Sequence, residues 1–585
     1  MLGRGRSGRW PVIAAIASFA GACAFAAPAD AVPGTLRIEG TPGDDHIVID
    51  ASAIDAGSYT VNGQTQPFAG VTKVIVDAGA GNDSVVVNNP TAGLFAPLLG
   101  MAVDGGDGPD SVTSQNGVAA TGSYASAFGS TPGRLVQVGP AKQVITTVAV
   151  ENASDFNSDQ KFVYKGTPGH DDLWVDDYPS YPLTSLRTIY TRPTNFSFGG
   201  KSAVTVDTLG TDSAPDTVKL TGRGQPFSDL AVDDGSQPAE DVITAQDFRF
   251  GEAGSGANLR LHGSRIEATP GTSGVDITAG TVALDGGTIG TSGAPLVTDT
   301  AGLDALAQGD LRILVKGRFM TSDVQLGGVR KPIGGGVRST DGSVWLAHEW
   351  NGAFTSLAQD AVVSGQSVYL RSDRLDISKG HVNAGAGGVT FQSNNPVPID
   401  LGATTDDYGS FNLSAAEIAN VRGPVLSIGQ PTSGLVTASD AITRPSTTSL
   451  GLISGTGFTA TGPGSVSAGQ VSLTDGSAGG RSWSVDPSGV SVDGRPPLRY
   501  GSTPDLQLNG GSGADAFAIK PSVLTTYAIS GGDPTTSPGD SLAYDAGGRS
   551  VSGDTTPPDG EVDATGVKPV IFTGIEDVSI ANSGP

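Results

Sequence analysis

The chain has 585 residues, a formal net charge of −25 and 86 glycines, while charged residues make up 16% and aromatic residues 6%. A helical protein would be richer in Leu, Glu, Lys and Arg. A surface this acidic also repels nucleic acid, which argues against a nucleic-acid partner. Short strands joined by Gly- and Asp-rich turns fit this composition best.

The beginning of the chain has the pattern of a bacterial Sec-type secretory signal, which we place at residues 1–31. Three arginines in the first nine residues precede an apolar run from 12 to 25, and residues 29–31 form an A-x-A cleavage site. The apolar run is too short to span a membrane comfortably. We therefore expect an extracellular or cell-surface protein without a transmembrane anchor. Cys23, the only cysteine, lies in this leader, where its lipidation is the alternative to simple cleavage.

A nonapeptide of the form G-G-x-G-x-D-x-U-x, where U is apolar, occurs at residues 105–113 and again at 510–518. Segments 40–48, 78–86 and 166–174 each depart from it at one glycine. Glycine permits positive φ, which turns carbonyl oxygens inward, and Asp adds the hard oxygen ligand that Ca²⁺ prefers. The candidate calcium-binding residues are Asp45, Asp83, Gly105, Gly106, Asp107, Gly108, Asp110, Asp171, Gly510, Gly511, Gly513 and Asp515.

This repeat resembles that of bacterial haemolysin-type calcium-binding repeat proteins. The resemblance implies a parallel β-roll with Ca²⁺ as its cofactor, in which nonapeptides run back to back and each ion lies between consecutive turns. In this chain the copies are tens of residues apart. Two interpretations stay open: the aspartates bind calcium, or the segments are Asp-Gly turns between strands and hold no ion.

Between Leu259 and Val471 short strands with alternating apolar residues recur at regular intervals. Val344 and Val368 are 24 residues apart, and Val368 and Val389 are 21 apart. This spacing matches one rung of a parallel β-helix. We therefore predict an all-β fold, a parallel β-helix or β-solenoid with calcium-roll-like Gly/Asp turns and room for smaller flanking β units.

The stretches 412–418, 425–429 and 449–455 resemble the repeats of bacterial filamentous-haemagglutinin-type surface proteins. The resemblance implies a right-handed β-helix on an exported, often adhesive, fibre. Within an insertion that begins near residue 394, Ser414 and Glu417 form a capping box, which predicts a short helix through Val421.

The expected parts of the chain follow from these changes in pattern. They are the signal peptide at 1–31, an N-terminal β region with calcium-type repeats at 32–135, a middle β region with degenerate repeats at 136–258, a parallel β-helix at 259–482, a junction at 483–504, and a C-terminal β region with a calcium-type repeat at 505–585.

The strongest candidate for catalysis is the segment from His170 to Tyr178. As a strand it would place Asp172, Trp174 and Asp176 on one face, and acids beside an aromatic ring can hold and cleave a sugar. The alternative is an acidic turn next to one buried strand. A second group, at residues 348–350, reads His-Glu-Trp but lacks the second His of a zinc-binding H-E-x-x-H motif.

The sequence therefore predicts a secreted or cell-surface, calcium-binding structural or adhesive β-solenoid that is not an enzyme. Its candidate partners are calcium ions and host or matrix glycans or proteins, and nucleic acid is not among them. The alternative is a secreted polysaccharide lyase or hydrolase built on the same β-helix.

Overall fold

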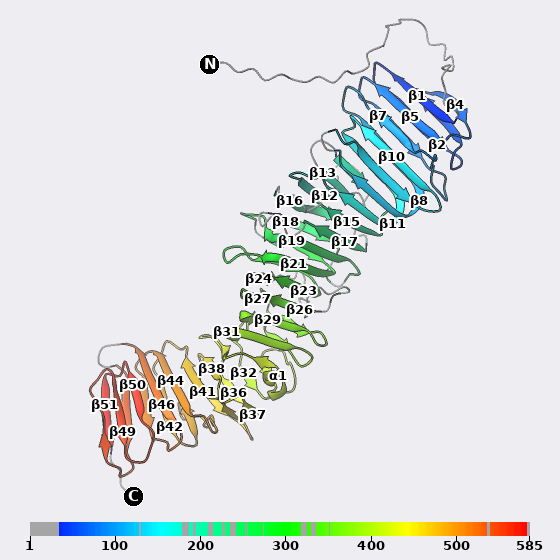
Figure 1. Cartoon of the computed structure of the whole chain (residues 1–585). Helices are drawn as coiled ribbons and strands as arrows, with labels where there is room; N and C mark the ends of the chain where they lie inside the picture. Colours follow the sequence, from blue (N-terminus) through cyan, green and yellow to red (C-terminus); the bar gives the residue numbers. More distant parts are fainter. Residues whose placement is uncertain are drawn as a thin grey trace, which may run out of the picture.

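The computed structural model describes residues 34–127, 130–177, 187–190, 195–208, 215–224, 228–234, 241–251, 253, 255–272, 274–316, 324–327, 329, 335–349, 351–534 and 539–581. Within these ranges the chain forms 51 strands and one helix. The predicted all-β solenoid-like class is therefore confirmed. Figure 1 shows a long, bent rod in which the first strands lie at one end and the last strands at the other. The leader and Cys23 lie outside the described residues.

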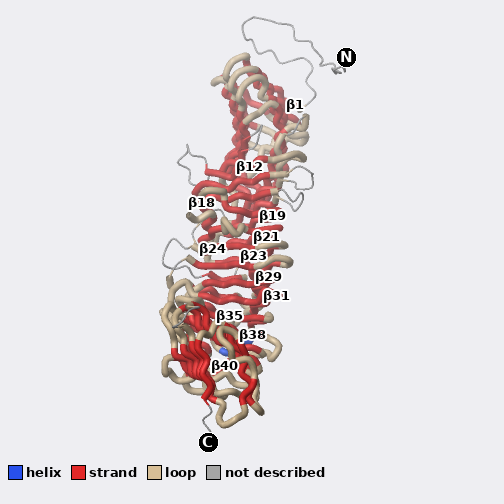
Figure 2. The backbone as a smooth tube through the Cα atoms, turned by 90° about the vertical axis from the view of Figure 1, so that its left-hand side faces the viewer, coloured by secondary structure: helices blue, strands red, loops and turns tan. Residues whose placement is uncertain are grey.

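Parallel pairing between successive rungs builds the rod, and Figure 2 shows the strands crossing its long axis one above another. One wall of the N-terminal part consists of β1 (Thr35–Thr41), β5 (Lys73–Gly79), β7 (Met101–Asp104) and β10 (Lys142–Val148). A second wall consists of β2 (His46–Ala51), β6 (Ser84–Asn88), β8 (Ser111–Ala125) and β11 (Asn152–Lys165).

The same parallel stacking continues through the middle and C-terminal parts. One middle wall consists of β15 (Ala203–Asp207), β17 (Asp229–Asp233), β19 (Asn258–Ala268), β21 (Thr281–Ile289) and β23 (Gly302–Ala307). The longest later wall consists of β27 (Val344–His348), β29 (Val362–Arg371), β31 (His381–Gln392), β35 (Val425–Gly429), β38 (Ser449–Ser454), β41 (Gln470–Asp475), β44 (Asp505–Ser512), β46 (Thr526–Asp533) and β50 (Val570–Thr573). A shorter C-terminal wall consists of β42 (Ser482–Asp486), β45 (Ala516–Ile519), β47 (Ser541–Asp545) and β51 (Asp577–Ala581).

The other strands complete the rungs or form short hairpins beside them. They are β3 (Gly57–Val61), β4 (Gln64–Phe68), β9 (Gly133–Val138), β12 (Asp172–Asp177), β13 (Arg187–Tyr190), β14 (Asn195–Phe198), β16 (Thr217–Gly224), β18 (Val242–Phe250), β20 (Ile277–Ala279), β22 (Leu296–Asp299), β24 (Leu311–Val315), β25 (Val324–Leu326), β26 (Gly336–Ser339), β28 (Phe354–Leu357), β30 (Arg374–Asp376), β32 (Ile399–Leu401), β33 (Phe411–Leu413), β34 (Val421–Arg422), β36 (Val436–Ala438), β37 (Ala441–Thr443), β39 (Phe458–Ala460), β40 (Ser465–Ser467), β43 (Gly489–Val492), β48 (Val551–Ser552) and β49 (Gly560–Ala564). Parallel pairs cross the positions where the sequence suggested boundaries, as when β41 pairs with β44. The division into parts stays a prediction.

The core is one continuous column of apolar side chains that runs from Ile38 to Ile575. The regular spacing of apolar residues in the sequence produces this column. Val344 lies in register with Val368 on the next rung, and Val368 lies in register with Val389. The column continues through Leu426, Leu450, Val471, Leu506, Tyr527 and Val570. Each rung of a solenoid can bury its apolar face only against its neighbours, so one apolar residue per rung at this position is what the fold requires.

The predicted capping box is confirmed at the helix α1 (Ala415–Ala419). The Glu417 N–H donates to Ser414 Oγ at 3.2 Å, and the Ser414 N–H donates to Glu417 Oε2 at 2.9 Å. The helix ends at Ala419 rather than at Val421, because Asn420 caps it and Val421 enters β34, where it pairs with Val382.

A buried polar group interrupts the apolar core of the N-terminal half. Lys201 Nζ lies 2.8 Å from Asp155 Oδ2 and 2.6 Å from Asp159 Oδ2, and all three side chains are fully buried. Burial, reinforced by the Asp155 carboxylate, raises the pKa of Asp159 to about 7. Because this group is closed to solvent, it is a structural cross-link between rungs and offers no access to a substrate.

Candidate functional site

The turns that carry the Gly/Asp repeats at 40–48, 78–86 and 105–113 lie directly above one another, although they are tens of residues apart in the chain. Ala80 and Asp107 form a parallel bridge between two such turns. The Gly81 N–H donates to the Asp107 carbonyl at 2.8 Å, and the Asp107 N–H donates to the Gly79 carbonyl at 3.1 Å. The wide spacing of the repeats in the sequence is therefore the length of a rung, and the repeats are neighbours in space.

The sixth-position aspartates of these turns, Asp45, Asp83 and Asp110, form a hydrogen-bonded stack that ends at Glu151. We call this stack the first carboxylate column. The Asp45 N–H donates to Asp83 Oδ1, the Asp83 N–H to Asp110 Oδ1 and the Asp110 N–H to Glu151 Oε2, each at 2.8 Å. The three aspartates are buried. The carboxylates of Asp83, Asp110 and Glu151 thus each satisfy a backbone donor of the preceding rung, which a buried N–H requires.

Two further columns repeat this arrangement along the rod. In the second column the Asp171 N–H donates to Asp216 Oδ1 at 2.7 Å and the Asp216 N–H to Asp241 Oδ1 at 2.9 Å. In the third column Asp515 Oδ1 accepts the Arg481 N–H at 2.6 Å. The third column then continues through Asp540 and Glu576, whose carboxylates accept the Asp515 and Asp540 N–H groups, each at 2.7 Å.

Sequence reasoning identified some members of these columns and missed others. The structure brings Asp45, Asp83 and Asp110 together, and it places Asp171 and Asp515 in columns of their own. It adds Asp216, Asp241 and Asp540, and the glutamates Glu151 and Glu576 that end the first and third columns. Asp216 and Asp540 lie in segments that match only the end of the repeat, at 215–218 and 539–542, whereas neither glutamate lies in a repeat.

The two repeats in which Thr replaces the second glycine occupy the first position of a column. The Thr41 N–H donates to Asp45 Oδ2 at 2.6 Å, and the Thr167 N–H donates to Asp171 Oδ2 at 2.7 Å. The threonine hydroxyls add bonds to the other oxygens of these carboxylates, at 3.1 and 3.0 Å. An aspartate at the start of a column has no preceding repeat to supply a donor, and the threonine supplies donors in its place.

In the first and third columns, four carboxylate oxygens are buried without a hydrogen-bond donor among the described residues. These oxygens are Oδ2 of Asp83, Asp110, Asp515 and Asp540. Burial raises the pKa of Asp83, Asp110 and Asp540, and it raises that of Asp515 to about 6, with the Asp540 and Asp475 charges adding to the effect. An unpaired carboxylate oxygen in such a place favours either a proton or a cation.

The repeat glycines are required by close contacts within the columns and between turns. A Cβ at Gly105 would lie 2.5 Å from Asp110 Oδ2, and one at Gly510 would lie 2.6 Å from Asp515 Oδ2. Gly106 has φ +93° and leaves no room for a Cβ beside the Gly79 carbonyl oxygen. Gly108, Gly511 and Gly513 also have positive φ. Asp107, by contrast, has an exposed side chain and enters the stack only through its backbone.

The columns supply only part of a calcium site. Ca²⁺ takes about six to eight oxygen ligands, whereas Asp83, Asp110, Asp515 and Asp540 each offer one unpaired carboxylate oxygen. The carbonyls of Gly79 and Asp107 already accept hydrogen bonds. Among the residues that the structure describes, no three His, Cys, Asp or Glu side chains are grouped so that they could hold a metal ion. A cation in a column would therefore take most of its ligands from backbone carbonyls or water.

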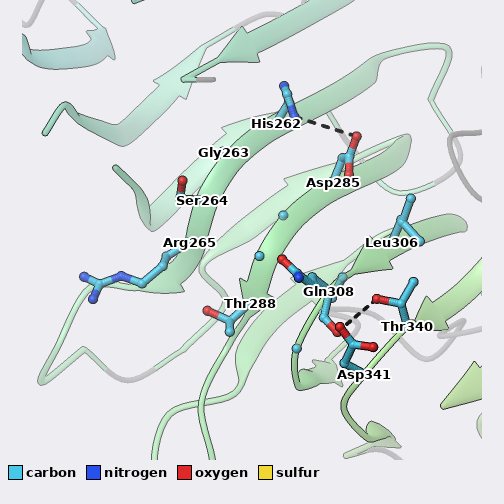
Figure 3. Close-up of a pocket in the computed structure, with 14 residues that line it drawn as sticks. His262, Gly263, Ser264, Arg265, Asp285, Thr288, Leu306, Gln308, Thr340 and Asp341 are labelled. Carbon is cyan, nitrogen blue, oxygen red and sulfur yellow. Dashed lines mark hydrogen bonds and ion pairs between the residues drawn. The ribbon is translucent and has the colours of Figure 1, made fainter. Parts of the chain in front are cut away.

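A separate surface groove of about 680 Å³ crosses β19, β21 and β23 (Figure 3). His262 lies on its edge, with Nδ1 2.8 Å from Asp233 Oδ1 and Nε2 3.9 Å from Asp285 Oδ2. The hydrogen bond to Asp233 raises the pKa of His262. Glycines form much of the floor, and Figure 3 places Gln308, Thr340 and Asp341 together in the part of the groove away from His262. An imidazole held between two carboxylates on neighbouring rungs can accept or donate a proton.

The groups that the sequence suggested for catalysis have other surroundings. In β12, Leu173 and Val175 are buried while Asp172 and Trp174 face outward, as the predicted alternation requires. Lys219 Nζ of the next rung lies 4.6 Å from the centre of the Trp174 ring. The side chains of Asp177 and Tyr178 lie outside the described residues.

His348 is a core residue. Its Nε2 lies 2.8 Å from Thr355 Oγ1, and burial lowers its pKa to about 3. The ring is therefore neutral and closed to solvent. Its neighbour Glu349 pairs with Lys316 at 2.9 Å, and residue 350 lies outside the described residues.

Comparison with known proteins finds no matching family model, no matching curated protein and no matching solved structure. Among the described residues there is also no helix with the length and apolar character that a membrane span needs. The geometry described above therefore carries the functional argument.

The first carboxylate column predicts unequal effects for two aspartates of one repeat. Replacing Asp110 by Ala removes the acceptor of the buried Asp83 N–H and should lower the free energy of unfolding by about 1–3 kcal/mol. Replacing the exposed Asp107 by Ala should change it by less than about 0.5 kcal/mol. Denaturant unfolding followed by tryptophan fluorescence measures both variants, and equal losses would show that the hydrogen bond between rungs is unimportant.

The third column predicts a pH dependence of stability. The pKa of Asp515 is about 6 in the fold and about 3.9 in an unfolded chain. The contribution of protonated Asp515 to the free energy of unfolding is therefore fully present below pH about 4. It is lost as the pH rises through about 6, a change of about 1–3 kcal/mol. Asp515→Asn cannot titrate and should flatten this part of the unfolding profile, while Asp107→Asn should leave it unchanged. Identical profiles for the wild type and Asp515→Asn would contradict the assignment.

Proposed function

We propose that this protein is a non-catalytic structural or adhesive β-solenoid, exported to the cell surface or the surrounding medium, and that it binds Ca²⁺ at its carboxylate columns. The observation that carries the proposal is the stacking of the Gly/Asp turns on successive rungs, which gathers distant aspartates into three columns. The leader-like first 31 residues and the two family resemblances support the same conclusion.

Calcium would act in this proposal by offsetting charge inside the columns. Neighbouring strands lie about 4.8 Å apart, so the carboxylates of one column are close enough to repel each other when ionised. The unpaired oxygens of Asp83, Asp110, Asp515 and Asp540 leave that charge without a local partner. A bound cation removes the repulsion and adds its binding free energy to the folded state.

An extended solenoid also suits adhesion, because it presents repeated side chains along a long face. Host or matrix glycans and proteins are the partners that such a face would contact. The acidic composition favours partners that are neutral or basic, or that bind through calcium.

The calcium proposal predicts that millimolar Ca²⁺ raises the melting temperature of the mature protein relative to chelator. Asp110→Ala or Asp515→Ala should reduce this rise, because each removes one unpaired carboxylate oxygen from a column, and Asp107→Ala should not. Calorimetry together with thermal unfolding in chelator, Mg²⁺ and Ca²⁺ measures the effect. Equal melting in chelator and in Ca²⁺ would reject the cation while leaving the solenoid fold unaffected.

A second candidate function, action on a polysaccharide, is favoured by one observation: the groove beside His262. The ring lies between Asp233 and Asp285, at the edge of an open, glycine-floored groove. This arrangement can hold a hydroxyl-rich chain and move a proton, which the Asp171–Asp177 segment does less well because Asp171 is committed to a column.

If the groove is an active site, the protein should release reducing ends or unsaturated products from at least one acidic or neutral polysaccharide. His262→Ala should lower the rate by about 100-fold or more, as expected for the loss of a general acid or base. His381→Ala, which changes an exposed histidine on β31, is the matched control. Product formation that survives His262→Ala, or no product from a broad panel, would reject this candidate.

A further inference from the structure

Two leucines near the N-terminal end of the rod are largely exposed to solvent. Leu98 is 85% and Leu99 is 68% exposed, and Ile54 beside them is 49% exposed. The two leucines lie in the loop that joins β6 to β7, and Ile54 lies in the turn between β2 and β3. All three border a surface hollow of about 520 Å³, which Arg134 and Lys142 also line. We call this surface the apolar tip.

Buried contacts and backbone hydrogen bonds fix the conformation of the loop that carries the apolar tip. Phe95 is fully buried; its N–H donates to Asn89 Oδ1 at 2.8 Å and its carbonyl accepts a bond from Gln143 Nε2 at 2.7 Å. The Leu99 N–H donates to the Thr72 carbonyl at 2.7 Å. The leucines therefore project from a fixed backbone, and their exposure contributes nothing to folding, because apolar surface left in water gains no free energy from burial.

The hollow beside the apolar tip is basic, although the surrounding part of the chain is acidic. Residues 34–150 contain ten acidic residues and four Lys or Arg residues, and two of those four, Arg134 and Lys142, line the hollow. No acidic side chain is among the residues that line it, within the part of the chain described. The nearest acid in sequence is Asp55, next to Ile54. Electrostatic repulsion from the acidic rod is screened beyond a Debye length of about 8–10 Å.

The size and shape of the apolar tip favour a lipid surface over a protein. A stable protein interface buries about 1,200–2,000 Å², which three projecting side chains do not supply. Binding at the boundary of a bilayer scales with the apolar area that is buried and with attraction to anionic lipids, and each Lys or Arg near the surface adds about 1 kcal/mol, so a small apolar surface beside two basic residues can bind reversibly. We propose that the apolar tip docks the N-terminal end of the rod reversibly onto a lipid surface that contains anionic headgroups. This inference does not depend on calcium binding or on the groove.

Flotation of the mature protein with lipid vesicles tests the proposal. Wild-type protein should bind vesicles of phosphatidylcholine that contain roughly one third phosphatidylglycerol more tightly than vesicles of phosphatidylcholine alone. The double variant Leu98→Ser/Leu99→Ser should weaken binding to both by about tenfold or more. The double variant Arg134→Gln/Lys142→Gln should remove the preference for the anionic vesicles. All four side chains are exposed, so circular dichroism and melting should match the wild type.

A matched control uses the other exposed apolar pair, Val523 and Leu524, which are 60% and 70% exposed at a loop near the far end of the chain. Val523→Ser/Leu524→Ser should leave vesicle binding unchanged, and equal loss in this control would overturn the apolar tip as a specific site. Absence of vesicle binding by the wild type would also overturn it. If light scattering instead shows that Leu98→Ser/Leu99→Ser dissociates an oligomer, the occupant is a second copy and the lipid proposal is wrong.

Discussion

The stacking of the Gly/Asp turns depends on one hydrogen bond that is repeated from rung to rung, in which the backbone N–H of a turn aspartate donates to the carboxylate on the next rung. The bond between Asp83 N–H and Asp110 Oδ1 is typical, at 2.8 Å. A second bond runs in the opposite direction beside it, because the Asp83 carbonyl accepts the Ser111 N–H, also at 2.8 Å. Together the two bonds lock neighbouring turns into a single register. A one-residue slip would break both bonds and expose the apolar side chain that follows each turn.

The same arrangement explains why the protein tolerates so many buried acids. In Asp110, Asp515 and Asp540, one carboxylate oxygen accepts a backbone N–H of the preceding rung, and a glycine lies close against the other oxygen. The cost of burying this second oxygen appears as a raised pKa, for example at Asp515. Protons and cations compete for that oxygen, so the folded state should respond to both. Inside the core, the ammonium group of Lys201 lies between Asp155 and Asp159 and supplies the positive charge that offsets their buried carboxylates.

The apolar column was predictable from the sequence, whereas the polar contacts were only partly so. Val344, Val368 and Val389 were found by spacing alone because every rung must place an apolar residue at that position. The repeats, in contrast, looked too far apart to cooperate, because distance along the chain does not reveal distance in a solenoid until the rung length is known. Glu151 and Glu576 carried no repeat signal, since a longer side chain reaches the same N–H without the surrounding glycines. The contact of His262 with Asp233 likewise depends on rung lengths that the sequence does not state.

The direct register of the apolar column gives the rod a natural unit of length. Leu426 lies on Leu450, and Leu450 lies on Val471, so the chain between two such residues is one complete circuit that begins and ends at equivalent points. Gain or loss of a whole circuit leaves the pairing of all other rungs intact, whereas gain or loss of a few residues inside a strand does not. Genes for such a protein can therefore change the reach of the rod in discrete steps by duplicating or deleting circuits, while its two ends keep their own surfaces.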